Sequence, residues 1–220
     1  MGSSLYYQLL EAPDLKLLLD QVQEALAAEQ KKRQEFYDWL TPSVKAEFIN
    51  GEIVMHSPAK KRHLRANKRL FNLLETYVTL KGSGEVDIEK ALVALTRNDY
   101  EPDICYWGPD KAATFDEETM RHPAPDLVVE VLSQSTEARD RGIKFRDYAA
   151  HGVTEYWIID PLKQTVEAHT LDLDFMRYET VPPLTIKDEL RSTVLAGFVI
   201  PVRAIFEVTA YQAALEGLMA

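Results

Sequence analysis

Two acidic residues of this 220-residue chain lie in short apolar runs, where an unpaired charge is unfavourable. Asp103 opens the run DICYW, and Glu130 lies in the middle of LVVEVLS. A carboxylate is buried at low cost only when it is paired with a cation or bound to a metal ion. The two acids are therefore candidate metal ligands. Each also has a structural interpretation: Asp103 as the cap of a strand end, and Glu130 as the partner of an arginine such as Arg139.

Asp126, which follows Pro125, competes with Asp103 as the partner of Glu130. Asp126 and Glu130 are four residues apart in one predicted strand, so at the rise of an extended chain they lie about 13 Å apart. That separation is too large for both carboxylates to hold one ion. Asp103 belongs to a different strand and has no such limit, so the spacing favours Asp103.

Three apolar runs must position these acids: DICYW, LVVEVLS and EYWIID. Each is rich in β-branched or aromatic residues and is bounded by Pro, Gly or Ser, which is typical of a buried strand. A polar segment with Arg and Lys, at about 139–150, predicts a crossover helix between the second and third runs. A strand, a helix and a strand in this order predict a parallel strand pair with the helix packed on one face.

The remaining elements are predicted from periodicity and turn residues. Leu15, Val22 and Leu26 indicate a helix over 14–39, which packs either on its own domain or on a partner chain. Asn50-Gly51 predicts a β-hairpin, because both turn positions need a positive φ. The other predicted elements are a helix over 58–80 broken by Gly82 to Gly84, one strand over EVDIEKALVALT, antiparallel edge strands over TVEAHTL and FMRYETV, and a short helix at the end of VLAGFVIPVRAIFE.

The composition predicts a globular cytoplasmic protein. It is 46% hydrophobic and 27% charged, which is ordinary for a globular chain. We find no apolar run near the roughly 18 residues that cross a membrane, and the first residues do not resemble a signal peptide. The single cysteine, Cys105, excludes an intrachain disulfide and fits a reducing compartment. We expect Cys105, Trp107 and Trp157 to be core residues.

The net charge of −10 argues against a protein that coats nucleic acid, which needs a strongly basic surface. A nuclease with one local basic patch remains compatible with that charge. Such a patch is present within ten positions, and it is the largest charge asymmetry of the chain. Its members are Lys60, Lys61, Arg62, His63, Arg65, Lys68 and Arg69.

The motif EVLSQST, followed by Asp140, Lys144, Tyr148 and then GVTEYWIIDP, resembles the Uma2-type restriction endonucleases. That family is a branch of the PD-(D/E)XK nuclease superfamily, and the resemblance runs from about Glu47 to Phe206. It implies an α/β (α+β) fold of the restriction-endonuclease type, with a mixed central sheet flanked by helices, here with a long N-terminal helix added. It also implies hydrolysis of DNA phosphodiester bonds with Mg²⁺, for which Mn²⁺ can substitute.

The resemblance also assigns roles to residues. Asp103, Glu130 and the carbonyl of Val131 would hold the metal ion, and Glu47 and His63 match the family's auxiliary positions. The superfamily's strand motif places a lysine two residues after the glutamate, where this chain has Leu132. The resemblance offers Lys144 as the substitute that assists the attacking water. Asp140, Lys144 and Tyr148 are spaced by four and therefore share one face of a helix.

Two functional interpretations follow. In the first, residues 42–220 form a nuclease-like domain behind a helical extension at 1–41, and the chain cleaves DNA as a monomer or a homodimer. The DNA backbone would contact Lys60, Lys61, Arg62, Arg65 and Lys68. In the second, the chain is a non-catalytic module for nucleic acid or protein binding that retains the nuclease fold. The acidic net charge and Leu132 favour the second, whereas the two acids in apolar runs favour the first.

Overall fold

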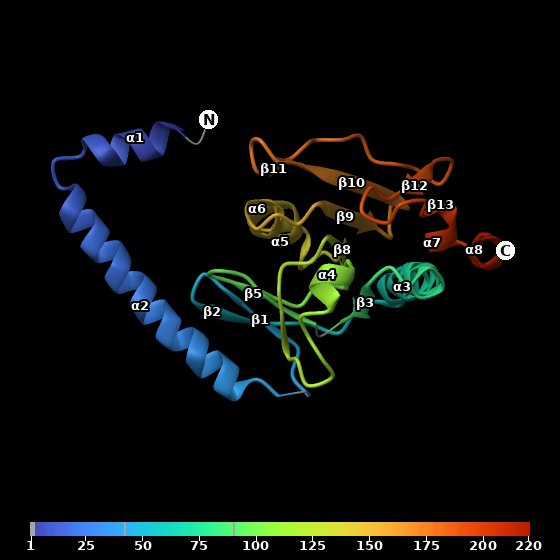
Figure 1. Cartoon of the computed structure of the whole chain (residues 1–220), viewed down its shortest axis with the longest axis horizontal. Helices are drawn as coiled ribbons and strands as arrows, with labels where there is room; N and C mark the ends of the chain where they lie inside the picture. The colour runs from blue at the N-terminus through green and yellow to red at the C-terminus, as the bar shows by residue number, and fades with distance from the viewer. Residues whose placement is uncertain (1–2, 42, 90) are drawn as a thin grey trace. The chain divides into compact units, whose positions relative to one another are not determined.

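The structure, a computed structural model, describes residues 3–41, 43–89 and 91–220. The chain divides into two compact units, Met1–Met55 and His56–Ala220, whose elements are labelled in Figure 1. The smaller unit includes the predicted hairpin together with the N-terminal helices. The domain boundary between residues 41 and 42 that the sequence suggests stays a prediction.

The smaller unit consists of α1 (Ser3–Glu11), α2 (Leu15–Trp39) and an antiparallel hairpin of β1 (Ala46–Ile49) and β2 (Glu52–Met55). The helix and hairpin predictions are confirmed, since Asn50 and Gly51 both have positive φ. Phe36 is buried, and its ring lies 5.7 Å from that of Phe48, so the end of α2 packs on the hairpin.

A six-stranded mixed sheet forms the centre of the larger unit, in the order β11-β10-β9-β8-β6-β3. The strands are β3 (Glu85–Ile88), β6 (Ile104–Trp107), β8 (Leu127–Val131), β9 (Glu155–Asp160), β10 (Thr165–Asp172) and β11 (Arg177–Tyr178). β8 and β9 run parallel, as predicted for strands joined by a crossover helix, and the other neighbours are antiparallel. The predicted strands DICYW, LVVEVLS and EYWIID are therefore confirmed as β6, β8 and β9.

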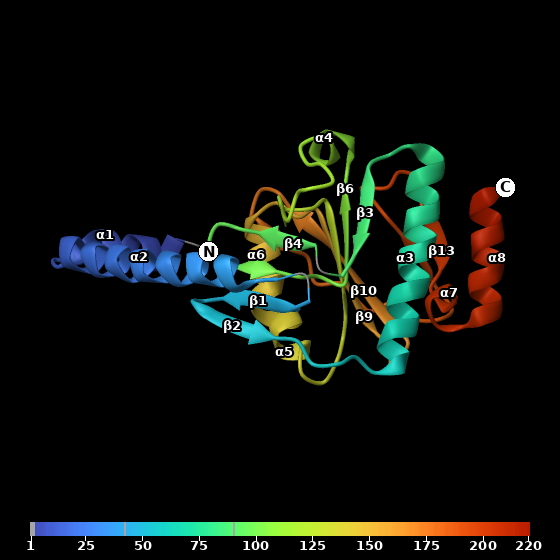
Figure 2. The same cartoon turned by 90° about the horizontal axis from the view of Figure 1, so that it is seen from below.

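Helices cover both faces of this sheet (Figure 2). One layer contains α3 (Lys61–Lys81), α7 (Arg203–Phe206) and α8 (Val208–Met219), and its apolar residues form the core with alternate side chains of β6, β8 and β9. The crossover segment α5 (Glu137–Arg139), η1 (Asp140–Lys144) and α6 (Phe145–Ala150) forms the other layer. The predicted α/β fold with a mixed sheet between helices is therefore confirmed.

Short strands complete the larger unit. β4 (Leu92–Ala94) pairs with β5 (Asp99–Tyr100) and, in parallel, with β7 (Arg121–His122). β12 (Glu189–Arg191) and β13 (Val199–Pro201) form a separate pair, and α4 covers Pro109–Ala112. Trp107 and Trp157 are fully buried, as predicted. Cys105 is also buried, and its burial raises the pKa of the thiol, so it is a neutral packing residue.

Three predictions of element boundaries were wrong. The helix predicted from residue 58 begins at Lys61, since the backbone of Lys60 is still extended (φ −71°, ψ 150°). The segment EVDIEKALVALT forms two strands of different sheets, β3 and β4; the backbone bends at Glu89, where φ is 48°. The crossover helix begins at Glu137 and contains a π-helical turn that the sequence pattern did not reveal. Periodicity also gave no indication of α8.

In the described part of the chain, we find no helix that is both long enough and apolar enough to cross a membrane.

Candidate active site

Strand pairing brings the two acids to the same place. In the antiparallel pair of β6 and β8, Ile104 lies opposite Val129, so one residue further along this register Asp103 faces Glu130. Side chains at facing positions point to the same side of the sheet, with Cβ atoms about 4.5–5.5 Å apart. Asp103 Oδ2 accepts a hydrogen bond from the backbone N–H of Val131 at 2.7 Å, which fixes its carboxylate at the end of β8. Asp103, the acid that the spacing favours, is thus the one that lies opposite Glu130, and its role as a metal ligand stays a prediction.

Asp126, the competing acid, has a separate structural task. Its Oδ2 accepts the backbone N–H of Gly108 at 2.7 Å, and its Oδ1 lies 2.7 Å from Lys111 Nζ. These contacts tie the start of β8 to the start of α4. Asp126 therefore serves as a useful reference for Asp103, because both follow a proline and only one faces Glu130.

Lys144 supplies the cation for Glu130. Its ammonium lies 2.8 Å from Glu130 Oε1, and Tyr148 donates its hydroxyl to the same oxygen at 3.2 Å. The side chain of Lys144 is only 2% exposed, and that of Glu130 only 6%. The pairing offsets the cost of burying both charges. Lys144 is therefore not a solvated helix residue, and Glu130 is paired with this lysine and with Tyr148.

The helix that carries Lys144 is locally π-helical. Asp140–Lys144 forms one π turn between α5 and α6, a distortion that is frequent at functional sites. Asp140 is almost fully buried, and its Oδ1 lies 3.7 Å from Lys144 Nζ. Two buried carboxylates therefore flank one buried ammonium. Asp140, Lys144 and Tyr148, which the spacing predicts to share one helix face, do lie together near Glu130. The helix between Asp140 and Lys144 is a π turn, whereas the spacing predicts an α-helix.

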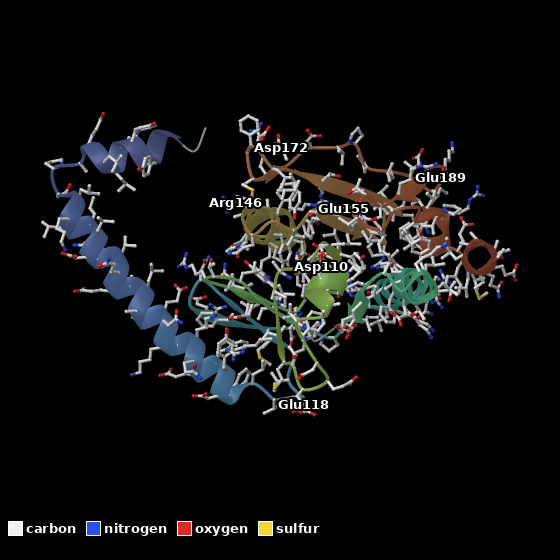
Figure 3. All side chains as sticks on the ribbon, in the orientation of Figure 1. Asp110, Glu118, Arg146, Glu155, Asp172 and Glu189 are labelled. Carbon is white, nitrogen blue, oxygen red and sulfur yellow. The ribbon has the colours of Figure 1, made fainter. Side chains whose placement is uncertain are left out.

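Two other cations of this helix, Arg141 and Arg146, have different surroundings. Arg141 forms ion pairs with Glu137 and Glu167, and the hydrogen bond to Glu167 raises the pKa of its guanidinium further. Arg146 is an exposed residue of α6 (Figure 3). Lys144 is therefore the helix cation that contacts Glu130.

His63 and Glu47, the two predicted auxiliary residues, lie in different units. His63 Nε2 lies 3.2 Å from Asp103 Oδ1, with both side chains about nine-tenths buried, so the first turn of α3 reaches the acid. Asn67, one turn further along α3, donates to Glu89 Oε1 at 3.5 Å. Glu47 lies on β1 of the smaller unit and is fully buried, and its role at the site stays a prediction.

Asp103 and Glu130 are the two carboxylates that the sequence predicts as metal ligands. Among the described residues, we find no group of three or more His, Cys, Asp or Glu side chains arranged to hold a metal ion. Structural zinc sites need four such ligands and catalytic ones three. Mg²⁺ binds through one or two carboxylates and completes its shell with water and substrate phosphate. The donor chemistry of Asp103 and Glu130 is compatible with this type of binding, and the ligand roles of both acids and of the Val131 carbonyl stay predictions.

The predicted basic patch lies at the start of α3. The side chains of its five predicted DNA-contact residues are exposed: Lys60, Lys61, Arg62, Arg65 and Lys68. The first turn of α3 contains no acidic residue, although the helix dipole favours anions there. This arrangement costs some helix stability and leaves the first turn of α3 with basic side chains only. Arg69 has a different task, since its guanidinium donates to the carbonyl of Phe206.

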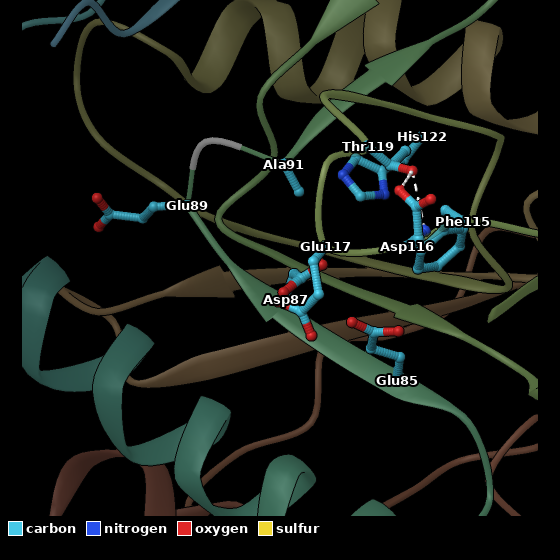
Figure 4. Close-up of a pocket in the computed structure, with 9 residues that line it drawn as sticks. All are labelled: Glu85, Asp87, Glu89, Ala91, Phe115, Asp116, Glu117, Thr119 and His122. Atoms are coloured by element: carbon cyan, nitrogen blue, oxygen red, sulfur yellow. Dashed lines mark hydrogen bonds between the residues drawn. The ribbon is translucent and has the colours of Figure 1, made fainter. Parts of the chain in front are cut away.

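A separate pocket of about 450 Å³ is lined mainly by acidic residues (Figure 4). Glu85 and Asp87 of β3 line it, together with Asp116 and Glu117, and His122 of β7. The pKa of the Glu85 carboxyl is raised, mainly by its partial burial and to a smaller extent by repulsion from the Asp87 carboxylate. The pocket lining includes neither Asp103 nor Glu130, and its charge disfavours a phosphate backbone. It is therefore distinct from the candidate active site.

Tyr100 is a site residue that the sequence analysis missed. Its ring centroid lies 5.5 Å from Lys144 Nζ, and the ring is fully buried. Tyr100 belongs to the two-residue strand β5, where no hydrophobic periodicity exists to single it out. The sequence signal that could have drawn attention to this position is the neighbouring acid Glu101, which comes just before Pro102-Asp103. Glu101 is also buried.

Comparison with known proteins gives a consistent result. The sequence pattern of a protein family described as "Uma2: Putative restriction endonuclease" matches residues 33–203. An uncharacterised protein of Synechocystis, slr1290, is 32% identical over 123 residues, which is 52% of this chain and 60% of that protein. The chain thus spans about three fifths of that relative's length.

Two solved structures are similar to the chain. One is described as a putative nuclease belonging to DUF820 from Anabaena variabilis. It has a TM-score of 0.68 and 16% identity, and the match covers 81% of this chain and 97% of that one. The other is the type IIG restriction endonuclease BpuSI, with a TM-score of 0.39 and 12% identity over 76% of this chain and 18% of the enzyme. The first likeness supports the nuclease-like fold assigned above.

Proposed function

Since the chain belongs to the Uma2 family of restriction-endonuclease-like proteins, we propose that it is a metal-dependent endonuclease that hydrolyses phosphodiester bonds of DNA. The observation that carries the proposal is the juxtaposition of Asp103 with Glu130 across β6 and β8, with the Lys144 ammonium 2.8 Å from Glu130. Two carboxylates and one cation, all buried at one sheet end, match the chemistry of that reaction.

The roles of the chain's own residues follow from their positions. Asp103 and Glu130 would hold Mg²⁺ or Mn²⁺, with the Val131 carbonyl as a third ligand. A metal ion bound there supplies Lewis acidity and lowers the pKa of a bound water. Lys144 orients the attacking water and stabilises negative charge that develops on the phosphate. His63 keeps the Asp103 carboxylate in place through its 3.2 Å contact.

The basic patch supplies the DNA-binding surface in this proposal. Lys61, Arg65 and Lys68 are exposed on the first two turns of α3, the helix that also carries His63. A phosphate backbone held along these turns would pass close to His63 and Asp103. A local patch of this kind reconciles a net charge of −10 with DNA binding. A homodimer and a cytoplasmic location stay predictions from the sequence.

Metal binding tests the proposal directly. We expect the purified chain to nick or cut plasmid DNA with Mg²⁺ or Mn²⁺ and to lose this activity with a chelator. At a metal concentration of about 100 times the Kd, binding should stabilise the fold by about 2.7 kcal/mol, or roughly 5–10 °C in melting temperature. If the chain neither cuts DNA nor gains stability with either metal, the result contradicts the nuclease proposal and favours the alternative, a non-catalytic binding module with the nuclease fold. Leu132, at the position of the superfamily's lysine, is the feature that favours that alternative.

Salt dependence tests the DNA-binding surface. Replacing Lys61, Arg65 and Lys68 by Gln should weaken DNA binding and flatten the slope of log K against log salt. The slope should fall by about 0.9 for each phosphate that the variant no longer neutralises, and so by up to about 2.7 for the triple variant. The matched control replaces three exposed cations of other elements by Gln: Lys163, Lys187 and Arg191. A salt slope that changes in the control and not in the α3 variant would move the DNA-binding surface elsewhere.

A further inference from the structure

The Lys144 ammonium is bordered by aromatic rings as well as by carboxylates. It lies 5.5 Å from the centroid of the Tyr100 ring, within the range of an attractive cation–π contact. The Tyr100 ring in turn contacts the Tyr148 ring edge to face, at a centroid distance of 5.2 Å. Tyr100, Tyr148 and Lys144 are all essentially buried. The position of the Tyr100 ring therefore limits where the ammonium can lie.

Asp147 fixes the Tyr100 ring. The Tyr100 hydroxyl donates to Asp147 Oδ2 at 2.8 Å, and Asn98 Nδ2 donates to the same oxygen at 2.6 Å. Asp147 lies three residues after Lys144, on α6. The helix that carries the lysine thus also holds the ring that borders its ammonium.

His151 joins the end of this helix to the turn before β5. The backbone N–H of Thr96 donates to His151 Nε2 at 3.2 Å, and the Thr96 hydroxyl lies 2.8 Å from the same nitrogen. Because Nε2 accepts an N–H, the ring proton is on Nδ1. His151 Nδ1 lies 2.8 Å from the backbone carbonyl oxygen of Asp147 and 3.1 Å from the side-chain Oδ1 of Asp147. His151 therefore connects Thr96 to Asp147 through its two ring nitrogens.

We infer that Tyr100, Asp147 and His151 are positioning residues that confine the Lys144 ammonium beside Glu130. A lysine side chain has a flexible four-carbon stem and a compact charge, so the stem by itself does not define where the charge lies. The series of contacts from Thr96 through His151 and Asp147 to Tyr100 fixes the ring that borders the ammonium on one side. Asp140 and Glu130 carry the negative charges that attract the ammonium. The catalytic consequence rests on the proposed nuclease function, whereas the confinement of the ammonium does not.

The test observes the ammonium itself. A buried, confined lysine ammonium should give a resolved, slowly exchanging signal in nitrogen-edited NMR spectra of the full chain, and Lys144→Met should assign it by removing it. We expect Asp147→Ala to broaden and shift this signal. Tyr100→Phe, which keeps the ring and loses the hydroxyl, should do so to a smaller extent. The matched control is Tyr77→Phe, which also loses a buried hydroxyl bond, to the carbonyl of Ala196, in another part of the core.

Cleavage kinetics give the second measurement. Misplacing a catalytic group by about 1 Å costs about 100-fold in rate, so Asp147→Ala should lower kcat by about 10- to 100-fold while KM changes by less than about twofold. Asp147→Asn should recover only part of kcat, because an amide oxygen still accepts from Tyr100 and Asn98 but the amide NH2 group would then face the Nδ1–H of His151. An unchanged Lys144 signal in both Asp147→Ala and Tyr100→Phe would overturn the inference. If the signal responds while the wild-type chain cuts no DNA, the positioning stands and the nuclease proposal fails.

Discussion

Replacing Asp103 by Asn or Glu130 by Gln should reduce DNA cleavage by at least about 100- to 1000-fold, the loss typical when one preorganised charge-stabilising group is removed. Both changes keep the shape of the side chain and remove its charge, so the proposed metal site would lose one of its two carboxylates. Glu130→Gln is preferable to Glu130→Ala, because the amide oxygen still accepts the hydrogen bond from Lys144. Removing that partner outright would leave the buried ammonium with only the more distant carboxylate of Asp140, at a cost of up to about 3–5 kcal/mol.

Asp126→Asn is the matched control for this result. Asp126 also follows a proline and is also hydrogen bonded, but it faces Gly108 and Lys111. It should therefore keep most of the wild-type cleavage rate with a modest loss of stability. The measurement is the initial rate of plasmid nicking at saturating metal, with circular dichroism to verify the fold. If the Asp103 and Glu130 variants cut as fast as the wild type, the proposed site is wrong.

Lys144→Met should abolish cleavage while the protein still binds metal. The lysine is not a ligand, so its loss leaves both carboxylates available to the ion. Without the ammonium, Glu130 is a buried charge that lacks this countercharge, so the variant should be less stable by about 3–5 kcal/mol in the absence of metal. Added Mg²⁺ or Mn²⁺ should then raise the melting temperature by at least as much as in the wild type. The measurements are the nicking rate and the melting temperature with and without metal.

A transplanted lysine provides the sharper test of this role. Leu132 lies two residues after Glu130, so its side chain points to the same face of the extended chain. A lysine there would approach Glu130 from the position that the superfamily uses. The double variant Lys144→Met with Leu132→Lys should therefore recover part of the wild-type activity, whereas Leu132→Lys alone should not increase the wild-type rate. Full activity in Lys144→Met would refute the role of this lysine.

The amino-acid sequence by itself determined the local elements and singled out the two acids. The hairpin depends on Asn50-Gly51, where both residues must adopt positive φ, and β6, β8 and β9 depend on dense runs of β-branched and aromatic residues. These are short-range preferences that a stretch of a few residues carries on its own. Asp103 and Glu130 stood out for the same reason, because an acid in an apolar run is unfavourable in any fold that buries the run.

Only the tertiary structure decided which groups meet at the site. The register between β6 and β8 places Asp103 opposite Glu130, and a slip of one residue would have turned one of them to the other face. The π turn in the crossover helix brings Lys144 to Glu130, and the hydrogen bond to Asp147 brings Tyr100 to Lys144. Each of these contacts joins different elements. The free energy that brings the elements together comes mainly from burying their apolar faces, and the pairing of Lys144 with Glu130 offsets the cost of burying those charges. No single segment of the sequence contains that information, because it arises only when the sheet and the crossover helix pack.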